Sequence, residues 1–168
     1  MKAFTLLVLS MLAANTLHGG TIVPEPFPPA AFTGLYLEND ERGGTTIIQL
    51  SGDALIYKKT DGGSKVLETT TVHPTGDEWF KFIQALNAAK VYKWVDKYYY
   101  PGQGPSWVID ITMEGRKFYS EGTNEFPKNG DEAEAAADPK AGPSIPFALY
   151  WAAALDLCGK GKLDPMTK

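Results

Sequence analysis

Four acidic residues near an aromatic-rich segment are the groups in this sequence best suited to catalyse hydrolysis: Asp96, Asp110, Glu114 and Glu121. Glycoside hydrolases need two carboxyl groups about 5–9.5 Å apart, one of which acts as an acid. Asp110 is the most prominent because it interrupts an apolar strand pattern, and Tyr119 is its expected cross-strand neighbour. A solvated Asp on the outer face of a sheet explains the same pattern without catalysis. We therefore assign no catalytic residue.

Aromatic side chains around a Gly/Pro-rich segment give a second lead, toward binding. Tyr and Trp combine a large apolar face with a polar tip, which suits stacking on sugars or on protein side chains. The alternative is that two or three of these rings fill the core and the rest shield a sheet edge. Together with Asp110 and Tyr119 they form the candidate ligand-binding set: Trp94, Tyr98, Tyr99, Tyr100, Trp107, Asp110 and Tyr119.

Histidine and cysteine are too scarce for other site chemistry. His73 precedes Pro74 at the end of an expected strand and lacks a nucleophile motif, so we interpret it as a surface histidine. Cys158 is the only cysteine and lies in an apolar run, where a buried thiol is expected. Their distant positions give no zinc spacing. We therefore expect no metal and no cofactor.

The first 20 residues have the features of a secretory signal peptide. Lys2 supplies the positive start, the apolar run Ala3–Ala14 is too short to span a bilayer, and cleavage is expected near Gly19 or Gly20. No later apolar run reaches the roughly 20 residues of a membrane span. We expect an exported protein, periplasmic or extracellular, without a membrane span.

Charge and composition limit the partner classes and the domain count. The formal charge of −4 becomes −5 without Lys2, and this acidity argues against a nucleic-acid partner. The 168 residues, 43% of them hydrophobic, suit one domain with a core of its own. We expect a Pro-rich spacer at 21–31, a single domain at 32–159 and a flexible tail at 160–168.

The strongest structural signal is a β-hairpin in residues 106–121. Trp107, Ile109 and Ile111 fall on one face of the strand, and Val108, Asp110 and Thr112 fall on the other, because strand side chains alternate. Glu114-Gly115 is typical of a two-residue turn, because Gly accepts a positive φ. This turn sets Asp110 opposite Tyr119. We expect helices to cover the face that carries Trp107.

Four more strands and two helices complete the expected fold. Closely spaced turn signals predict an antiparallel meander, with a charged loop at 39–44 after its first strand. A helix should begin near Asp77, and a fifth strand or a continued helix should follow at 91–97. A last helix, 145–158, is apolar nearly all round and should be well buried. The expected class is α+β: an antiparallel sheet of five to seven strands with two helices packed on one face.

Part of the sequence resembles a family of uncharacterised bacterial exported proteins. The resemblance rests on Trp107-x-Ile109-x-Ile111 followed by Tyr119-Ser120-x-Gly122-x-Asn124-x-Phe126-Pro127. It covers about residues 79–159, with a Trp-led helix upstream and an apolar helix near the end. That family has no assigned activity. The resemblance therefore implies the hairpin and a single domain, and it transfers no catalytic residue.

Three functional hypotheses remain open at this point. The first is a non-catalytic binding or inhibitor-like module that uses the aromatic loop against a protein or glycan ligand. The second is a small secreted hydrolase with a carboxylate pair that includes Asp110. The third is a structural component of the cell envelope. The sequence does not assign an oligomeric state.

Overall fold

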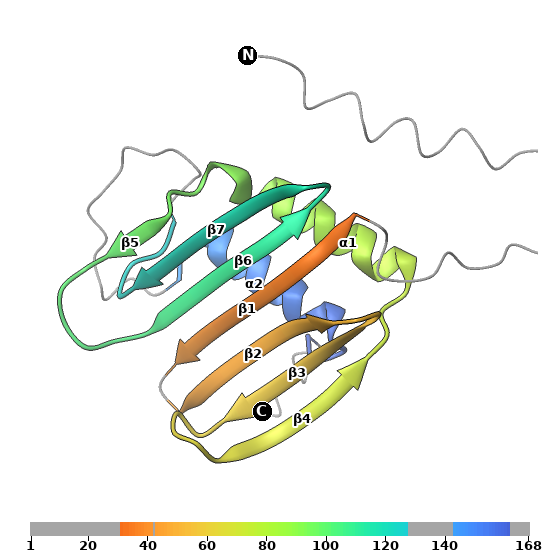
Figure 1. The fold of residues 1–168 in the computed structure, drawn as a ribbon. Coiled ribbons are helices and arrows are strands. Elements are labelled where there is room, and N and C mark those ends of the chain that lie inside the picture. Colours follow the sequence, from red (N-terminus) through yellow and green to blue (C-terminus); the bar gives the residue numbers. More distant parts are fainter. Residues whose placement is uncertain (1–30, 42, 128–142, 162–168) are drawn as a thin grey trace, which may run out of the picture.

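The described residues of this computed structural model, 31–41, 43–127 and 143–161, form one sheet with two α-helices (Figure 1). The expected signal peptide, spacer residues 21–30 and tail residues 162–168 lie outside them. The sheet has seven strands in the order β4-β3-β2-β1-β6-β7-β5. This architecture confirms the predicted α+β class. No helix in the described ranges is long and apolar enough to cross a membrane.

An antiparallel meander forms one half of the sheet. Its strands are β1 (Phe32–Glu41), β2 (Gly44–Ser51), β3 (Ala54–Thr60) and β4 (Val66–Val72). The loop predicted at 39–44 is wrong, because β1 continues to Glu41. Asn39 pairs with Thr46 and keeps the inward alternation that begins at Leu35 and Leu37.

The predicted hairpin is confirmed in its register. Strands β6 (Ser106–Met113) and β7 (Arg116–Thr123) pair with Asp110 opposite Tyr119. Glu114 and Gly115 have φ values of 51° and 72°, as a tight two-residue turn requires. β6 also pairs with β1, so the hairpin joins the meander into one continuous sheet.

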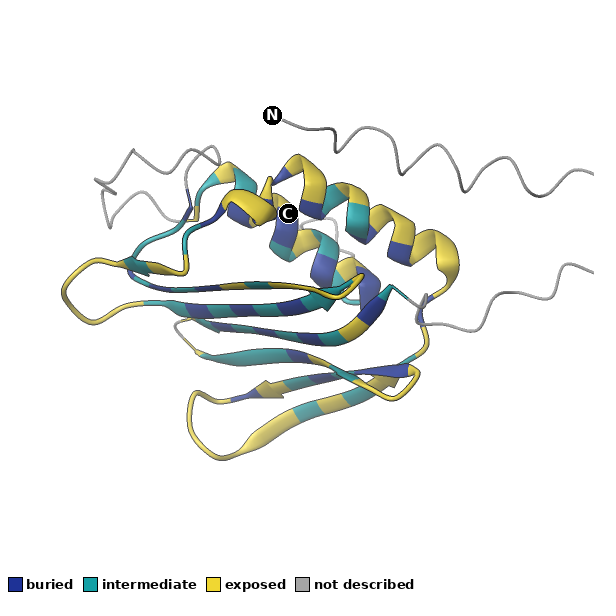
Figure 2. Cartoon of the chain, turned by 45° about the horizontal axis from the view of Figure 1, so that its top comes forward, coloured by how far each residue is buried: buried dark blue, intermediate teal, exposed yellow. Residues whose placement is uncertain are grey.

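Two helices cover the same face of the sheet (Figure 2). Helix α1 (Gly76–Ala88) starts with a capping box, in which Thr75 and Glu78 satisfy each other's backbone N–H groups. Helix α2 (Ile145–Leu157) starts at Ser144, whose hydroxyl accepts from the Phe147 N–H at 3.4 Å. The opposite face of the sheet carries no helix of the described chain.

The core lies between this sheet face and the helices. Trp107, Ile109 and Ile111 are each 1% exposed, as the strand pattern indicated. Trp107 packs against a second tryptophan and against two phenylalanines, with ring centroids 5.1–6.4 Å apart. A second ring cluster, Phe32 with Trp79 and Phe82, holds α1 on the sheet. The first cluster packs β6 against α2, and the second packs β1 against α1.

The last helix is less buried than its composition indicated. Ile145 is 85% exposed and Leu149 is 44% exposed. Only one side of α2 meets the sheet and α1, through residues such as Phe147 and Tyr150. The prediction of a well-buried helix therefore holds for one side only, because a helix on the outer layer of a two-layer fold keeps its other side outside.

Residues 91–97 form neither of the two elements expected there. Lys90 adopts a left-handed conformation with φ of 53° and ends α1. A 3₁₀ helix, η1 (Val91–Lys93), follows, and a short strand, β5 (Lys97–Tyr99), then pairs in parallel with β7. The chain turns here because Trp94 enters the core, where its Nε1 donates to the Ala89 carbonyl at 3.0 Å.

Candidate binding site along the edge of strand β7

The seven residues proposed for ligand binding separate into three groups. Trp94 and Trp107 are 7% and 1% exposed and belong to the aromatic core. Tyr98 is half-buried on the helix side, 5.7 Å from the Trp107 ring centre. The remaining four are accessible from outside to different degrees: Tyr99, Tyr100, Asp110 and Tyr119. Trp107 therefore shapes the site from within, and Trp94 meets it only as part of a cavity wall.

The loop after β5 is fixed by Asn124. Its Nδ2 donates to the Gly102 carbonyl at 2.8 Å, and its backbone N–H donates to the Pro105 carbonyl at 2.9 Å. Asn124 itself has a φ of 56°, a conformation that Asn tolerates better than most residues. The exposed Tyr99 and Tyr100 thus lie at the start of a loop whose backbone has defined anchors.

The helix-free face of the sheet carries a row of tyrosines and charged groups. Tyr36 pairs with Asp110, and Asp110 pairs with Tyr119. Lys117 forms an ion pair with Asp110 at 3.0 Å. Tyr36 donates to the Glu38 carboxylate, and its pKa is raised to about 12 by burial and by this carboxylate.

A second tyrosine–carboxylate pair lies nearer the sheet edge. The Tyr119 hydroxyl donates to Glu121 Oε2 at 2.7 Å, and Lys97 approaches the same carboxyl at 3.5 Å. The hydrogen bond from Tyr119, with help from Lys97, lowers the pKa of Glu121. The same bond raises the pKa of Tyr119, since its proton is held by an anion.

Two further carboxylates lie diagonally across from Asp110 on this face. They are Glu38 on β1 and Glu121 on β7, which pair with Val108 from its two sides. Diagonal neighbours on one sheet face have β-carbons roughly 7–8 Å apart or somewhat less. The strand register thus places two carboxylates near Asp110, although each of them already accepts a hydrogen bond from a tyrosine hydroxyl.

Most of β7 lies at an open edge of the sheet. β5 pairs only with Glu121, Gly122 and Thr123. The Asp96 carbonyl accepts from the Glu121 N–H at 2.9 Å, and this bond is the start of the pairing. Beside residues 116–120, no other strand of the described chain occupies the outer side of β7.

Two residues of this edge direct their backbone groups outward. A two-residue turn makes the residues that flank it a hydrogen-bonded pair, and such pairs alternate along an antiparallel ladder. Arg116, Phe118 and Ser120 therefore exchange hydrogen bonds with β6. The backbone N–H and carbonyl groups of Lys117 and Tyr119 point away from β6. The N–H of Glu121, two residues further on, points the same way and donates to the Asp96 carbonyl. The edge offers two N–H groups and two carbonyls to a partner.

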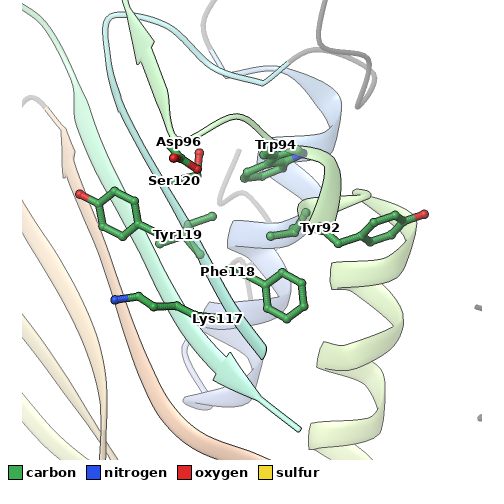
Figure 3. A pocket seen from close by; sticks show the side chains of 9 residues that line it. Tyr92, Trp94, Asp96, Lys117, Phe118, Tyr119 and Ser120 are labelled. Carbon is green, nitrogen blue, oxygen red and sulfur yellow. The ribbon is translucent and has the colours of Figure 1, made fainter. Parts of the chain in front are cut away.

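A cavity of about 160 Å³ follows the same edge (Figure 3). Lys117 and Tyr119 line it from the helix-free face, and Phe118 and Ser120 line it from the helix face. Successive residues of a strand point to opposite faces, so all four meet one cavity only if it runs along the strand's edge. Its far wall comes from the segment between α1 and β5: Val91, Tyr92, Trp94 and Asp96.

A smaller apolar hollow of about 20 Å³ extends this cavity toward α1. The two share Val91, Tyr92 and Phe118, and the hollow adds Leu86 and Met113. Tyr92 is 44% exposed at the rim. Together the two spaces form what we call the edge groove, with an apolar floor and a polar end at Asp96 and Ser120.

The polar end of the edge groove is held by the backbone before β5. The Ser120 hydroxyl donates to the Val95 carbonyl at 2.7 Å, and the Val95 N–H donates to the Tyr98 hydroxyl at 3.2 Å. These bonds join the segment to β7 at the point where β5 begins to pair. The groove therefore has a fixed end.

Comparisons with known proteins find no relative. No family model matches the chain, and no curated protein or solved structure is significantly similar to it. The resemblance to exported bacterial proteins stays an expectation.

The one histidine and the one cysteine of the described residues lie outside the lining of the edge groove. The described part of the chain contains no cluster of three or more His, Cys, Asp or Glu side chains that could hold a metal ion. His73 lies exposed after β4. Cys158 is 3% exposed, as predicted, and burial raises the pKa of its thiol to about 12.

Sequence reasoning missed the residues that make the groove an edge site. Tyr92 and Phe118 were in no candidate set, and Asp96 was considered only as a catalytic acid, whereas Tyr119 was in the binding set. Their role depends on where β5 starts to pair, and three residues of strand give no periodic signal. The one usable signal was Lys90-Val91, where helical periodicity stops before a tryptophan that must be buried.

Proposed function

We propose that this protein is an exported, non-catalytic binding module that accepts an extended peptide segment along the open edge of β7. The observation that carries the proposal is the coincidence of unpaired outward backbone groups at Lys117 and Tyr119 with the edge groove. A bound strand would hydrogen-bond to those groups and extend the sheet. Export rests on the N-terminal leader in the sequence.

The chemistry of the edge favours a peptide over a glycan. Outward groups that recur every second residue repeat at about 6.6–6.8 Å, the two-residue repeat of another β-strand. In strand addition, main-chain bonds give affinity and pockets for alternate side chains give specificity. The floor of the edge groove is apolar, with Leu86, Val91 and Phe118. We expect ligands with apolar residues at every second position.

The opposite edge of the sheet is less suited to this role. β4 pairs with β3 through a register shift at Lys59 and Thr60, and such bulges blunt an edge against further pairing. On its helix side, Glu68 is engaged in an ion pair with Lys160. β4 therefore serves as an internal control for edge binding.

The hydrolase hypothesis keeps one favourable observation, the diagonal placement of Glu38 and Glu121 around Asp110. A glycosidase acid needs a raised pKa. The pKa of Glu121 is lowered instead, and Asp110 forms an ion pair with Lys117. Assay against a panel of nitrophenyl glycosides tests this alternative. Turnover that is lost in both Asp110→Asn and Glu121→Gln would establish it.

Selection from a random displayed-peptide library tests the binding proposal. We expect enriched peptides with alternating apolar residues. Tyr119→Pro removes one outward N–H without touching the bonds to β6, and edge strands tolerate proline. Because an intramolecular hydrogen bond contributes about 1 kcal/mol, we expect roughly fivefold weaker binding or more.

Thr69→Pro is the matched control. The two-residue turn between β2 and β3 sets the alternation of hydrogen-bonded pairs, and this alternation directs the backbone N–H of Thr69 away from β3. This substitution should leave peptide affinity unchanged. Thermal melts of both variants check folding. A library without enrichment, or equal losses in the two proline variants, would contradict the proposal.

A further inference from the structure

A second cavity lies at the other end of the sheet, away from the edge groove. It has a volume of about 280 Å³ and is lined by strands β1, β2 and β3 and by the C-terminal half of α2. Four of its side chains carry the argument below: Asn39, Tyr57, Lys59 and Trp151. The two cavities share no residue.

Asn39 is a polar residue at a core position of the cavity wall. It is 3% exposed, and the preceding inward residue of β1, Leu37, is fully buried. Its Nδ2 donates to Glu41 Oε1 at 2.7 Å. A carboxylate only accepts hydrogen bonds, so this contact fixes which end of the amide is nitrogen.

The other end of the amide has no protein partner in the described chain. Asn39 Oδ1 is buried and accepts no hydrogen bond from any described residue. A buried acceptor without a donor costs about 1–3 kcal/mol, so such groups usually serve a ligand, a water or a function. The orphaned oxygen beside a cavity marks a place for an O–H or N–H donor.

Two aromatic rings form apolar parts of the same cavity. Trp151 projects from α2, and Tyr57 projects from β3. Lys160 lies over the Tyr57 ring, with its Nζ 5.2 Å from the centroid, and its charge is paired with Glu68. This pairing leaves one acid, Glu41, and one base, Lys59, as the remaining charged groups of the lining.

We propose that this cavity binds a neutral, hydroxyl-rich ligand about as large as one sugar ring. A volume of about 280 Å³ is just below the usual range of ligand pockets, roughly 300–1,000 Å³, so it admits only a small ligand. Opposite charges at Glu41 and Lys59 balance, so no net charge is required of the ligand. An aromatic wall suits the C–H face of a sugar.

Hydroxyl groups fit the polar lining because each can donate and accept. Asn39 Oδ1 is closed off from the cavity in the free protein, so a ligand hydroxyl donates to it after the amide turns and exchanges its bond to Glu41 for bonds to the ligand. Another accepts from the Lys59 ammonium. The ring lies against Trp151.

Protein-observed NMR with defined small molecules tests the site. The probes are glucose, galactose, N-acetylglucosamine and myo-inositol, with sodium sulfate and glycine as charged comparisons. We expect at least one neutral probe to shift the Trp151 indole N–H and the Asn39 side-chain amide. Lys59→Ala and Trp151→Leu should each weaken that binding at least fivefold.

Lys58→Ala is the matched control, because Lys58 is the neighbour of Lys59 and projects to the opposite face of the sheet. It should bind as the parent does. Shifts at these two groups produced only by sulfate or glycine would overturn the proposed ligand class. Absence of any shift, or binding that survives both cavity substitutions, would overturn the site. Peptide binding at β7 is unaffected by either outcome.

Discussion

Trp107 lies directly against the backbone of Gly122, its cross-strand partner. A β-carbon added at Gly122 would be 2.3 Å from the indole Nε1 and 2.4 Å from Cε2. The same Nε1 donates to the Glu125 carbonyl at 2.8 Å, so the ring position is fixed from two sides. The absence of a side chain at Gly122 lets the tryptophan close the core beside the edge groove.

Gly122→Ala should therefore destabilise the fold by about 1–3 kcal/mol, the usual range for overpacking. The ring cannot move without losing its hydrogen bond or its contacts with Phe126 and Phe147. Urea denaturation measures the change. Gly76→Ala is the control, since nothing lies within 4 Å of its added β-carbon. Equal stability of the two variants would contradict this packing.

Asn124 should be needed for both its backbone conformation and its amide. Asn124→Ala loses the bond to the Gly102 carbonyl and places Ala at a φ of 56°. We expect a loss of about 1–3 kcal/mol from these two effects. Asn124→Gly, which relieves the backbone, should fall between Ala and the parent. Proteolysis of the loop at 100–105 provides the second readout, and an unchanged Gly variant would show that the amide is dispensable.

Cys158 should be unreactive in the folded protein. Burial raises the pKa of its thiol from 9.0 to about 12, so very little thiolate forms at pH 8. Alkylation by iodoacetamide should be at least about 100-fold slower in the folded protein than in guanidinium. The thiol's contribution to stability is complete below pH 9 and is lost as the pH rises from 9 through 12. Equal alkylation rates would show that the thiol is exposed.

The Tyr119–Glu121 pair should make the β7 edge sensitive to acid. Because the folded-state pKa of Glu121 is lowered, its stabilising effect is present above the ordinary value of 4.5 and is lost as pH falls below it. Tyr119→Phe removes the largest cause of this shift. NMR titration of the Glu121 side-chain carboxyl should give a higher pKa in the variant. An unchanged value would assign the shift to Lys97 alone.

Local patterns allowed much of the fold to be predicted from the sequence. The hairpin register follows from one turn and a two-residue period, and both were visible around Glu114-Gly115. The start of a helix near Asp77 was predicted in the same way, and the structure has it at Gly76 with Thr75 as the N-cap. Such features involve residues close in the chain, where spacing determines which side chains meet.

The parts that were mispredicted depend on tertiary contacts. A parallel pairing of only three residues, Lys97–Tyr99 with β7, has no local signal. Burial of Trp94 interrupts regular structure in residues 91–97, and its only local sign is the end of helical periodicity at Lys90-Val91. The edge groove exists because β5 starts late; of the predicted binding set, Trp94 and Tyr119 line it, and Tyr92 and Phe118 are added by the structure.

Amide hydrogen exchange along β7 tests the central claim most directly. In the free protein, the amides of Lys117 and Tyr119 should exchange freely while those of Phe118 and Ser120 are protected by bonds to β6. Saturation with a library-selected peptide should slow exchange at Lys117 and Tyr119 by at least about tenfold and leave the amide of Thr69 on β4 unchanged. Protection of Lys117 and Tyr119 in the free protein, or no change on adding a bound peptide, would contradict strand addition at this edge.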